Sequence, residues 1–263
     1  MKHLDYKLAG KIAFISGGSH GIGFEITKLL GKYGCKVIYC SRTSDRLKKT
    51  KIILDDLGIE NFPIQFDALD ESSCLNAFNL AEKKYGHIDI LINNVGGGGR
   101  WGKENVEETD LNVWDEVFNK NARAAIIFTK KCIPYMRKKK WGRVITITSI
   151  YGKEGGGRPW FNMAKASEVS LMKTLSMKKY LVRDGITFNS VAPGKIYIPG
   201  TGSEKEKNNN KNQFLKSIDE NIPVGRMGKP EEIAYLVTFL CSEMSGFING
   251  SQICVDGGET KSF

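Results

Sequence analysis

A serine, an aromatic ring and a lysine are spaced in this chain in a way that could move a proton. The stretch from Ser149 to Ser167 reads SIYGKEGGGRPWFNMAKAS, with Phe161 four residues before Lys165. Positions four apart lie on one face of a helix, so a lysine at 165 would lower the pKa of a hydroxyl at 161. Phenylalanine has no such hydroxyl. The spacing predicts a proton-transfer site whose donor position is occupied by a ring without a proton to give.

A glycine-rich turn supplies a second candidate site. The motif SGGSHGIG follows the apolar segment 11–16 and places glycines where a helix begins. Glycine lets the backbone turn tightly and approach a pyrophosphate, while the amino terminus of the helix offers unpaired N–H groups. A tight turn without a ligand is the alternative interpretation. The position in the chain favours a dinucleotide site, with these candidate residues: Gly17, Ser19, His20, Gly21, Ile22 and Gly23.

The residues after the second apolar segment bear on the choice of dinucleotide. An acidic residue about 20 positions beyond the glycines would bind the ribose hydroxyls of NAD, whereas arginine accommodates the 2′-phosphate of NADP. The chain reads CSRTSDR there, with Ser41 and Arg42 and no carboxylate before Asp45. A surface salt bridge is the alternative role for Arg42. The pattern favours NADP, with NAD as the second choice.

Short apolar runs alternate with amphipathic stretches along the whole chain. Continuous apolar strands separated by helices indicate a parallel sheet covered on both faces. We therefore expect one α/β domain over residues 1–263, a Rossmann-type doubly wound parallel sheet of about seven strands with helices on both faces. The expected strands are 11–16, 36–40, 62–66, 88–93, 143–148, 186–191 and 252–256.

Unusual loops follow most of these strands. The carboxyl ends of parallel strands meet at one edge of a sheet, where ligands of such folds bind. The longest loop, APGKIYIPGTGSEKEKNNNKNQ, lacks apolar periodicity and is rich in Glu, Lys and Asn. We expect a substrate lid at about residues 195–221.

Seven motifs in order resemble those of a short-chain dehydrogenase/reductase, close in pattern to the 3-oxoacyl-acyl-carrier-protein reductase type. The resemblance covers nearly the whole chain. The motifs are SGGSHGIG, NNVG at 93–96, the asparagine of NKNARAA, the serine before IYG, the lysine of FNMAK, VAPG at 191–194, and the tail from PVGRMGKPEEIAYLV to VDGG.

The resemblance implies roles for individual residues. Asn121, Ser149 and Lys165 match three members of an Asn–Ser–Tyr–Lys tetrad, and Phe161 stands at the tyrosine. Lys165 would also bind the nicotinamide ribose. The remaining implied cofactor contacts are Asp67 at the adenine, Asn94 and Gly96 in the channel, and Pro193, Gly194 and Ile196 beside the nicotinamide.

The chemistry implied is interconversion of a ketone and a secondary alcohol by hydride transfer to or from NAD(P)(H). Three explanations for Phe161 stay open. The first is an engineered change from tyrosine that traps a complex. The second is a natural variant in which Tyr151 or water supplies the proton. The third is a catalytically silent nucleotide-binding or scaffold protein.

Cations and aromatic residues are frequent on the loops expected around the nicotinamide. Together they favour a polar, anionic substrate such as a phosphorylated or nucleotide-linked sugar, although each taken singly is better explained as a solvent-facing side chain. The candidate substrate residues are Arg100, Trp101, Tyr151, Lys153, Arg158 and Trp160, with Lys103 and Lys195 nearby.

Bulk properties narrow the class of protein. The formal charge of +10 is spread over helical faces without interleaved stacking aromatics, so we expect a small-molecule carbonyl or alcohol substrate and no nucleic-acid partner. No apolar run reaches membrane-spanning length and no apolar leader begins the chain, which favours the cytoplasm. Six scattered cysteines indicate reduced thiols and no metal site. The resemblance implies a homotetramer or a homodimer, with the carboxyl-terminal segment between subunits.

Overall fold

Seven short apolar segments form a single sheet whose strands are all parallel. The computed structural model describes residues 5–262. The strand order is β3-β2-β1-β4-β5-β6-β7, which confirms the predicted fold class. The strands are β1 (Ile12–Ser16), β2 (Lys36–Ser41), β3 (Asn61–Gln65), β4 (Ile90–Asn93), β5 (Gly142–Ile147), β6 (Ile186–Pro193) and β7 (Gln252–Val255).

The order of the strands places the cofactor crevice. From β1 the chain runs outward through β2 to β3, and then crosses back to put β4 on the other side of β1. The loops after β1 and β4 therefore diverge to opposite faces of the sheet. The space between them at the carboxyl edge is where open α/β sheets bind their ligands.

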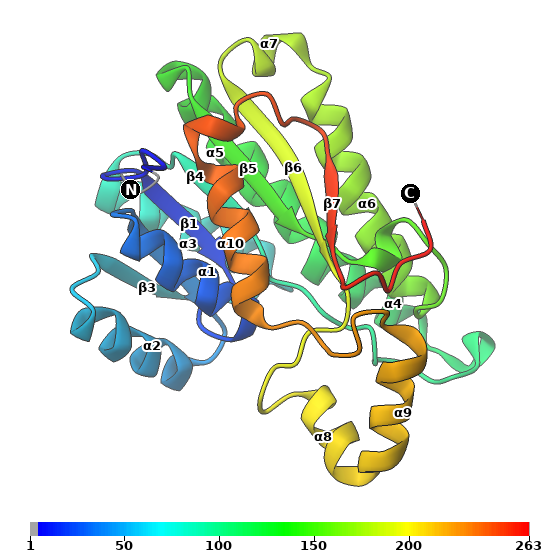
Figure 1. Ribbon diagram of the computed structural model, residues 1–263. Coiled ribbons are helices and arrows are strands. Elements are labelled where there is room, and N and C mark those ends of the chain that lie inside the picture. Colours follow the sequence, from blue (N-terminus) through cyan, green and yellow to red (C-terminus); the bar gives the residue numbers. More distant parts are fainter. Residues whose placement is uncertain (1–4, 263) are drawn as a thin grey trace.

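Helices cover both faces of the sheet (Figure 1). The main ones are α1 (Gly21–Lys32), α2 (Ser44–Asp56), α3 (Glu71–Tyr85), α4 (Leu111–Phe118), α5 (Ala124–Lys139), α6 (Pro159–Ser176) and α10 (Pro230–Cys241). Shorter elements are the 3₁₀ turns η1 (Val106–Glu108), η3 (Ile150–Gly152) and η4 (Glu243–Ser245), the π-helical turn η2 (Asn119–Arg123) and α7 (Lys179–Val182).

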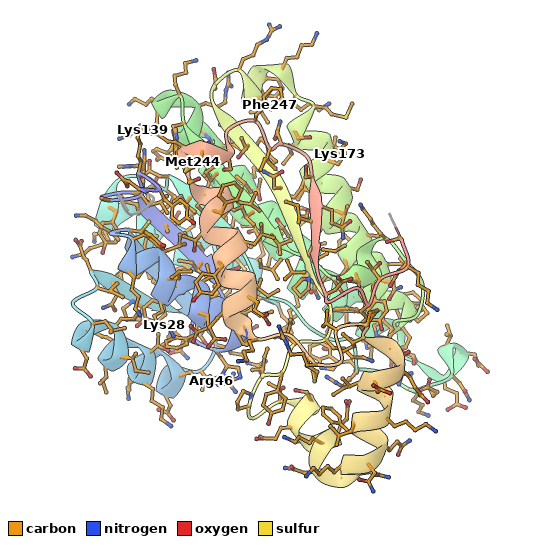
Figure 2. All side chains as sticks on the ribbon, in the orientation of Figure 1. Lys28, Arg46, Lys139, Lys173, Met244 and Phe247 are labelled. Atoms are coloured by element: carbon orange, nitrogen blue, oxygen red, sulfur yellow. The ribbon has the colours of Figure 1, made fainter. Side chains whose placement is uncertain are left out.

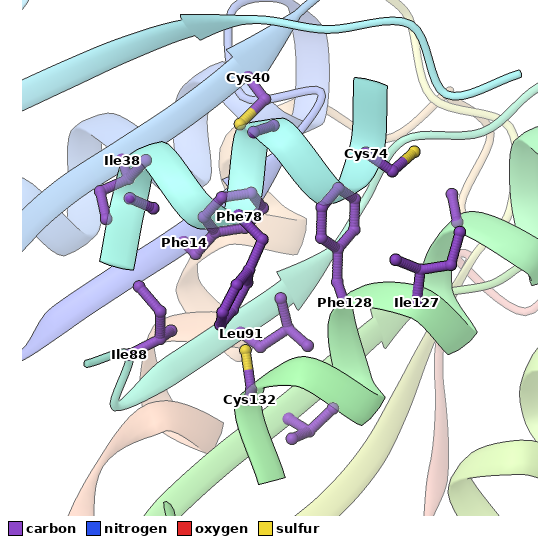
Figure 3. Close-up of a cluster of buried hydrophobic side chains, with 14 of the residues drawn as sticks. Phe14, Ile38, Cys40, Cys74, Phe78, Ile88, Leu91, Ile127, Phe128 and Cys132 are labelled. Carbon is purple, nitrogen blue, oxygen red and sulfur yellow. The ribbon is translucent and has the colours of Figure 1, made fainter. Parts of the chain in front are cut away.

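Two apolar cores form because successive strand residues point to opposite faces. In β1, Ile12 and Phe14 pack with α3, α5 and α6, whereas Ala13 and Ile15 pack with α1, α2 and α10. Figure 3 shows the first core, in which the rings of Phe14 and Phe128 lie 4.9 Å apart between centroids. The two cores fix the strand ends from which the site loops emerge.

The segment expected to be a lid contains two helices, α8 (Gly202–Asn209) and α9 (Lys211–Asn221). They project beyond the sheet at the lower right of Figure 1. Ser203 and Ile218 are their buried residues, and Asn210 caps α9 by accepting a hydrogen bond from Gln213 N at 3.0 Å. The absence of apolar periodicity follows from this shallow packing, since a helix that buries one residue needs no apolar stripe.

All six cysteines are free thiols, and all but Cys254 are buried. No helix among residues 5–262 is long and apolar enough to cross a membrane. Within the same residues, no group of three His, Cys, Asp or Glu side chains lies close enough together to hold a metal ion.

Candidate active site

The glycine-rich turn joins β1 to α1 through a backbone shape that side chains would obstruct. Gly17 has a φ of +68°, in the left-handed region that favours glycine. A Cβ at Gly17 would lie 3.0 Å from the Asn94 Nδ2 atom and 3.1 Å from the Val95 Cα atom. The loop after β4 can approach the turn this closely only because no side chain intervenes.

Hydrogen bonds hold the loops after β1 and β4 against each other. Asn94 Nδ2 donates to the carbonyl oxygens of Ser16 and Gly17, both at 3.0 Å. The Ser16 hydroxyl oxygen in turn accepts from the backbone N–H groups of Asn94 at 3.0 Å and Val95 at 3.1 Å. These bonds set the width of the crevice before any ligand binds.

A cavity of about 340 Å³ opens in this crevice. The predicted cofactor residues on its wall are Gly17, Ser19, His20, Gly21, Ile22, Gly23, Ser41, Arg42, Asp67, Asn94 and Gly96. Sequence reasoning missed Thr43, Arg46, Phe66, Ala68, Leu69, Val95, Lys120 and Ile198, which also line it. The four other predicted cofactor residues, Lys165, Pro193, Gly194 and Ile196, do not line this cavity.

Cations gather on the wall of the cavity. Arg42 and Arg46 come from the end of β2 and the start of α2, and Lys120 comes from η2 on the opposite side. Burial lowers the pKa of Lys120, and the charge of Arg42 lowers it further. Asp67 is the acidic residue on the same wall. This charge distribution suits an anionic ligand such as a phosphate.

His20 has an unpaired polar atom in the same cavity. Its Nε2 atom is buried and has no hydrogen-bond partner. Burial lowers the pKa of the imidazole, with a further lowering from the charge of Arg46, which favours the neutral ring. A buried polar nitrogen usually has a partner, so this atom, the glycine turn and the arginines together fit a dinucleotide phosphate.

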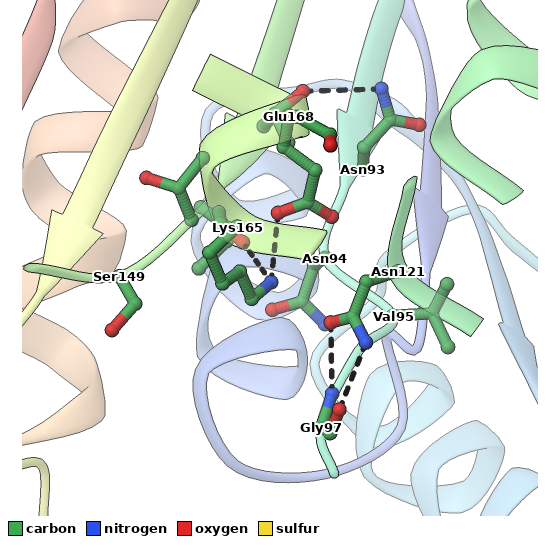
Figure 4. Close-up of polar contacts among 12 residues, drawn as sticks. Asn93, Asn94, Val95, Gly97, Asn121, Ser149, Lys165 and Glu168 are labelled. Atoms are coloured by element: carbon green, nitrogen blue, oxygen red, sulfur yellow. Dashed lines mark hydrogen bonds and ion pairs between the residues drawn. The ribbon is translucent and has the colours of Figure 1, made fainter. Parts of the chain in front are cut away.

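Asn121, the asparagine of the predicted tetrad, lies in a π-helical turn. Asn121 is fully buried within η2, the π-helical turn between α4 and α5. Its Nδ2 atom donates to the carbonyl oxygens of Gly97 at 2.8 Å and Val117 at 2.7 Å, and its Oδ1 atom accepts from Gly97 N at 3.1 Å. Figure 4 shows Asn121 clamping the backbone at Gly97 in this way. Such π-helical turns occur frequently at functional sites.

Lys165 reaches the same place from α6. Its Nζ atom donates to the Ile147 carbonyl oxygen at 3.1 Å and to Glu168 Oε2 at 2.9 Å. A Cβ at Gly96 would lie 2.5 Å from Asn121 Oδ1 and 3.1 Å from Lys165 Nζ. The backbone at Gly96 therefore lies close to both Asn121 and Lys165, although these two residues are 44 positions apart in the sequence.

Phe161 occupies the position predicted for a catalytic hydroxyl, on the same helix as Lys165. The Lys165 Nζ atom lies 5.8 Å from the centroid of its ring. The ring packs beside Val117, Trp160 and Ala164, and a Cβ at Gly99 would lie 3.5 Å from it. An aromatic ring therefore fits here, but it offers no hydroxyl.

Ser149 follows β5 and begins the turn η3. Its hydroxyl oxygen accepts a hydrogen bond from Tyr151 N at 3.3 Å, and the side chain is almost fully buried. In Figure 4 it lies apart from the Lys165 and Asn121 contacts.

Beyond β6, the residues predicted beside the nicotinamide lie on the backbone path toward the lid. Gly194 packs so closely on the carboxyl-terminal segment that a Cβ there would lie 2.6 Å from Asp256 Cβ. Ile196 forms a parallel bridge with Gly228. These contacts fix the start of the segment that carries α8 and α9.

Carboxylates neutralise several loop cations predicted to bind an anionic substrate. Arg100 pairs with Glu206 at 2.8 Å and Arg158 with Glu104 at 2.8 Å. Lys103 pairs with Glu108 at 3.3 Å and Lys195 with Glu259 at 3.7 Å. Carboxylates therefore compensate the charge of these cations. The partners of Arg100, Arg158 and Lys195 are distant in sequence, whereas Glu108 is five residues from Lys103.

Trp160 corrects one prediction. Its side chain is 1% exposed and packs edge-on against Trp114, with ring centroids 5.3 Å apart. It supports the helix that carries Phe161 and does not line an open pocket. Trp101, by contrast, is half-buried, with Lys120 Nζ 4.6 Å from its ring centroid.

A second cavity of about 700 Å³ lies between η3, α9 and the carboxyl-terminal segment. Tyr151 lines it together with Lys195, Glu154 and Glu259. Burial raises the pKa of Tyr151, and the charges of Glu259 and Glu154 raise it further. Its phenol is therefore a weaker acid than an ordinary tyrosine, which is opposite to what a proton donor requires.

The family model described as enoyl-(acyl carrier protein) reductase matches residues 17–260, from the glycine turn to the carboxyl-terminal segment. The chain belongs to the short-chain dehydrogenase/reductase family. Residues 17–260 of this short-chain dehydrogenase/reductase include the first cavity, η2, α6 and every residue that lines the second cavity except Lys261.

Named relatives of this short-chain dehydrogenase/reductase act on different substrates. A 3-oxoacyl-acyl-carrier-protein reductase of Aquifex aeolicus is 32% identical, covering 97% of this chain and 99% of its own length. A 7alpha-hydroxysteroid dehydrogenase of Bacteroides fragilis is 29% identical, covering 97% and 96%. L-sorbose reductase from Gluconobacter frateurii, solved with NADPH and L-sorbose, superposes with a TM-score of 0.91 at 28% identity, covering 99% and 100%. These similarities establish that the chain belongs to a family of oxidoreductases. They do not distinguish among an acyl thioester, a steroid and a sugar as its substrate.

Proposed function

We propose that this short-chain dehydrogenase/reductase binds NADP(H) and has most of the active-site residues needed to reduce a polar ketone to a secondary alcohol. The observation that carries the proposal is the cavity of about 340 Å³ lined by the glycine turn, Arg42 and Arg46, next to the cluster of Asn121 and Lys165. The NADPH in the solved L-sorbose reductase supports the choice of cofactor.

The adenosine half would be held by the cations at the end of β2. Arg42 and Arg46 would bind the 2′-phosphate, while the turn at the start of α1 would hold the pyrophosphate with its backbone N–H groups. His20 Nε2, unpaired in the same cavity, would then gain a partner. Asp67 would accept from the adenine amino group, the contact that the sequence motif implies.

The reactive half would lie toward Lys165 and Ser149. The nicotinamide supplies or removes the hydride when it is bound. Ser149 would hold the substrate oxygen with its hydroxyl, and Lys165 would donate to the nicotinamide ribose. Asn121 would hold the backbone at Gly97, keeping the neighbouring Gly96 close to Lys165.

Phe161 leaves this active site without a proton donor, because its ring has no hydroxyl. A ring fits the position and stacks beside the site, but proton transfer by a positioned group is worth about 10² to 10⁴-fold in rate. We propose that the chain with Phe161 is impaired in turnover, whether the change is engineered or natural. The raised pKa of Tyr151 argues against its serving as the replacement donor.

The substrate would be a polar ketone, with a sugar as the leading class. The L-sorbose in its solved structural relative supports that class. The pairing of Arg100, Arg158 and Lys195 with carboxylates gives no support to the phosphorylated or nucleotide-linked alternatives. We propose that residues 195–221 cover the bound substrate, since Ile198 lines the cofactor cavity and Glu206 of α8 pairs with Arg100 on the loop after β4.

A protein that binds NADPH without turnover is the second candidate function. The observations that favour it are the missing hydroxyl at Phe161 and the carboxylate that compensates Lys165. Screening keto sugars and acyl thioesters with the Phe161→Tyr variant separates the two. Consumption of NADPH with one substrate class supports the reductase and names that class. Tight NADPH binding without consumption of any substrate supports the second candidate and contradicts the first.

A further inference from the structure

A carboxylate lies buried directly beside Lys165. Glu168 is three residues farther along α6, and its side chain is 1% exposed, against 5% for Lys165. The Glu168 Oε2 atom lies 2.9 Å from Lys165 Nζ. Figure 4 shows the Lys165 ammonium joined to the Glu168 carboxylate by a dashed line. Neither the cofactor contacts nor the proton transfer proposed above requires Glu168.

The pair leaves one hydrogen-bond donor of Lys165 for a ligand. An ammonium has three N–H groups, and two of them bind Ile147 O and Glu168 Oε2. The Nζ atom also lies within 3.1 Å of where a Cβ at Gly96 would be, at the border of the cofactor loop. The carboxylate and the carbonyl thus fix the ammonium from behind and leave its remaining N–H for the channel.

Few other charges act on this pair. Burial raises the pKa of the Glu168 carboxyl, and the Lys165 ammonium opposes that rise. The elements packed against α6 contribute Thr146, Ser190 and Asn121, which are buried and uncharged, and Tyr151, whose pKa is raised. Their cations are the half-buried Lys120 of η2, the exposed Arg123 and Lys179, and Arg143, which is buried near the start of β5 and donates to carbonyl oxygens. The acidic residues of α4, Asp115 and Glu116, are exposed. Lys165 and Glu168 therefore depend mainly on each other for charge compensation.

We propose that Glu168 is a positioning residue, which keeps the Lys165 ammonium charged and aimed at the nicotinamide ribose. The proposal rests on the proposed binding of NADP(H). Removing one partner of a buried pair leaves an uncompensated charge, and the interior relieves it by loss of the lysine proton. Without Glu168, the ribose contact would therefore fail as the pH rises.

The test is the pH dependence of NADPH binding in the Glu168→Gln variant, which keeps the size of the side chain and removes its charge. Fluorescence titration from about pH 7.5 to about pH 9 should give a nearly constant dissociation constant for the parent, because the 2′-phosphate, whose second pKa is about 6, stays ionised over this range. In the variant, affinity should fall by about tenfold over the same range. Glu168→Asp, which restores the charge, should recover part of the binding at high pH. Glu25→Gln, which breaks a half-buried i, i+3 pair with Lys28 on α1, is the matched control and should behave as the parent.

A second readout follows the lysine itself. Carbon-13 labelling of the lysine side chains, with the Lys165 resonance assigned through Lys165→Arg, reports its ionisation by NMR without cofactor. Lys165 should lose its proton at lower pH in Glu168→Gln than in the parent. If Glu168→Gln fails to fold, the NADPH titration is carried out with Glu168→Asp instead, and a pH profile identical to that of the parent overturns the proposal.

The two readouts separate the possible failures. A variant that binds NADPH with the parent's flat pH profile and titrates Lys165 identically overturns the role of Glu168. If the parent binds no NADPH, the proposed cofactor is wrong. The NMR titration, which needs no cofactor, then still tests whether Glu168 affects Lys165.

Discussion

At the scale of single residues, the site combines an intact lysine with a ring that cannot give a proton. The four-residue spacing from Phe161 to Lys165 could be recognised in the sequence because it follows from helix geometry. Glu168 could not, since a carboxylate in an amphipathic helix is ordinarily solvent-facing. Its inward direction depends on how α6 rotates against β5 and β6. Lys120 and Arg46 were missed for a similar reason, because their direction depends on helix packing.

Arg42 lines the cofactor cavity, and we propose that it recognises the 2′-phosphate of NADP(H). Because a hydrogen bond to a charged group contributes about 1.5–3 kcal/mol, Arg42→Ala should weaken NADPH binding by roughly 10 to 100-fold and leave NADH binding nearly unchanged. Fluorescence titration with both cofactors measures this difference. Arg183→Ala, which removes an exposed arginine after α7, is the control. Equal losses for NADPH and NADH would contradict the assignment of Arg42 to the 2′-phosphate.

At the scale of elements, the seven strands could be predicted closely because buried parallel strands are short continuous apolar runs. The predicted segment 186–191 extends to Pro193 in β6, since its pairing with β7 continues. The pairing of loop cations could not be predicted. Arg100 and Glu206 are brought together by the placement of α8, which no local pattern encodes.

The start of α10 gives a pH test of stability. Glu232 accepts hydrogen bonds from Arg226 and from Lys229 N, and the Arg226 bond chiefly lowers its pKa from 4.5 to about 2. A depressed pKa in the folded state contributes stability that is present above pH 4.5 and is lost as the pH falls toward 2. Urea unfolding should therefore show a smaller loss of stability from neutral to acidic pH in Glu232→Gln than in the parent. Identical acid profiles would contradict this role for Glu232.

At the scale of the whole molecule, some apolar side chains are exposed on the surface of the single chain. Phe247 is fully exposed and Met244 is 55% exposed, at the end of the molecule opposite α8 and α9 (Figure 2). The family resemblance implies subunits that pack through other surfaces, including the carboxyl-terminal segment. Neither composition nor the fold of one chain fixes the number of copies.

The assembly can be measured directly. Light scattering after size-exclusion chromatography should give the mass of two or four copies of this 29.3-kDa chain. Phe247→Ser should leave that mass unchanged, since Phe247 lies outside the carboxyl-terminal segment. A monomer at micromolar concentration would contradict the expectation drawn from the family.

The most direct test of the account is the rate of NADPH oxidation by Phe161→Tyr and by the parent chain, with a polar ketone substrate. Phe247→Tyr adds the same hydroxyl at an exposed position and is the matched control. The account predicts that Phe161→Tyr raises turnover by about 10² to 10⁴-fold with little change in NADPH affinity, while Phe247→Tyr changes neither. Equal turnover by Phe161→Tyr and the parent, with a substrate that binds both, would contradict it.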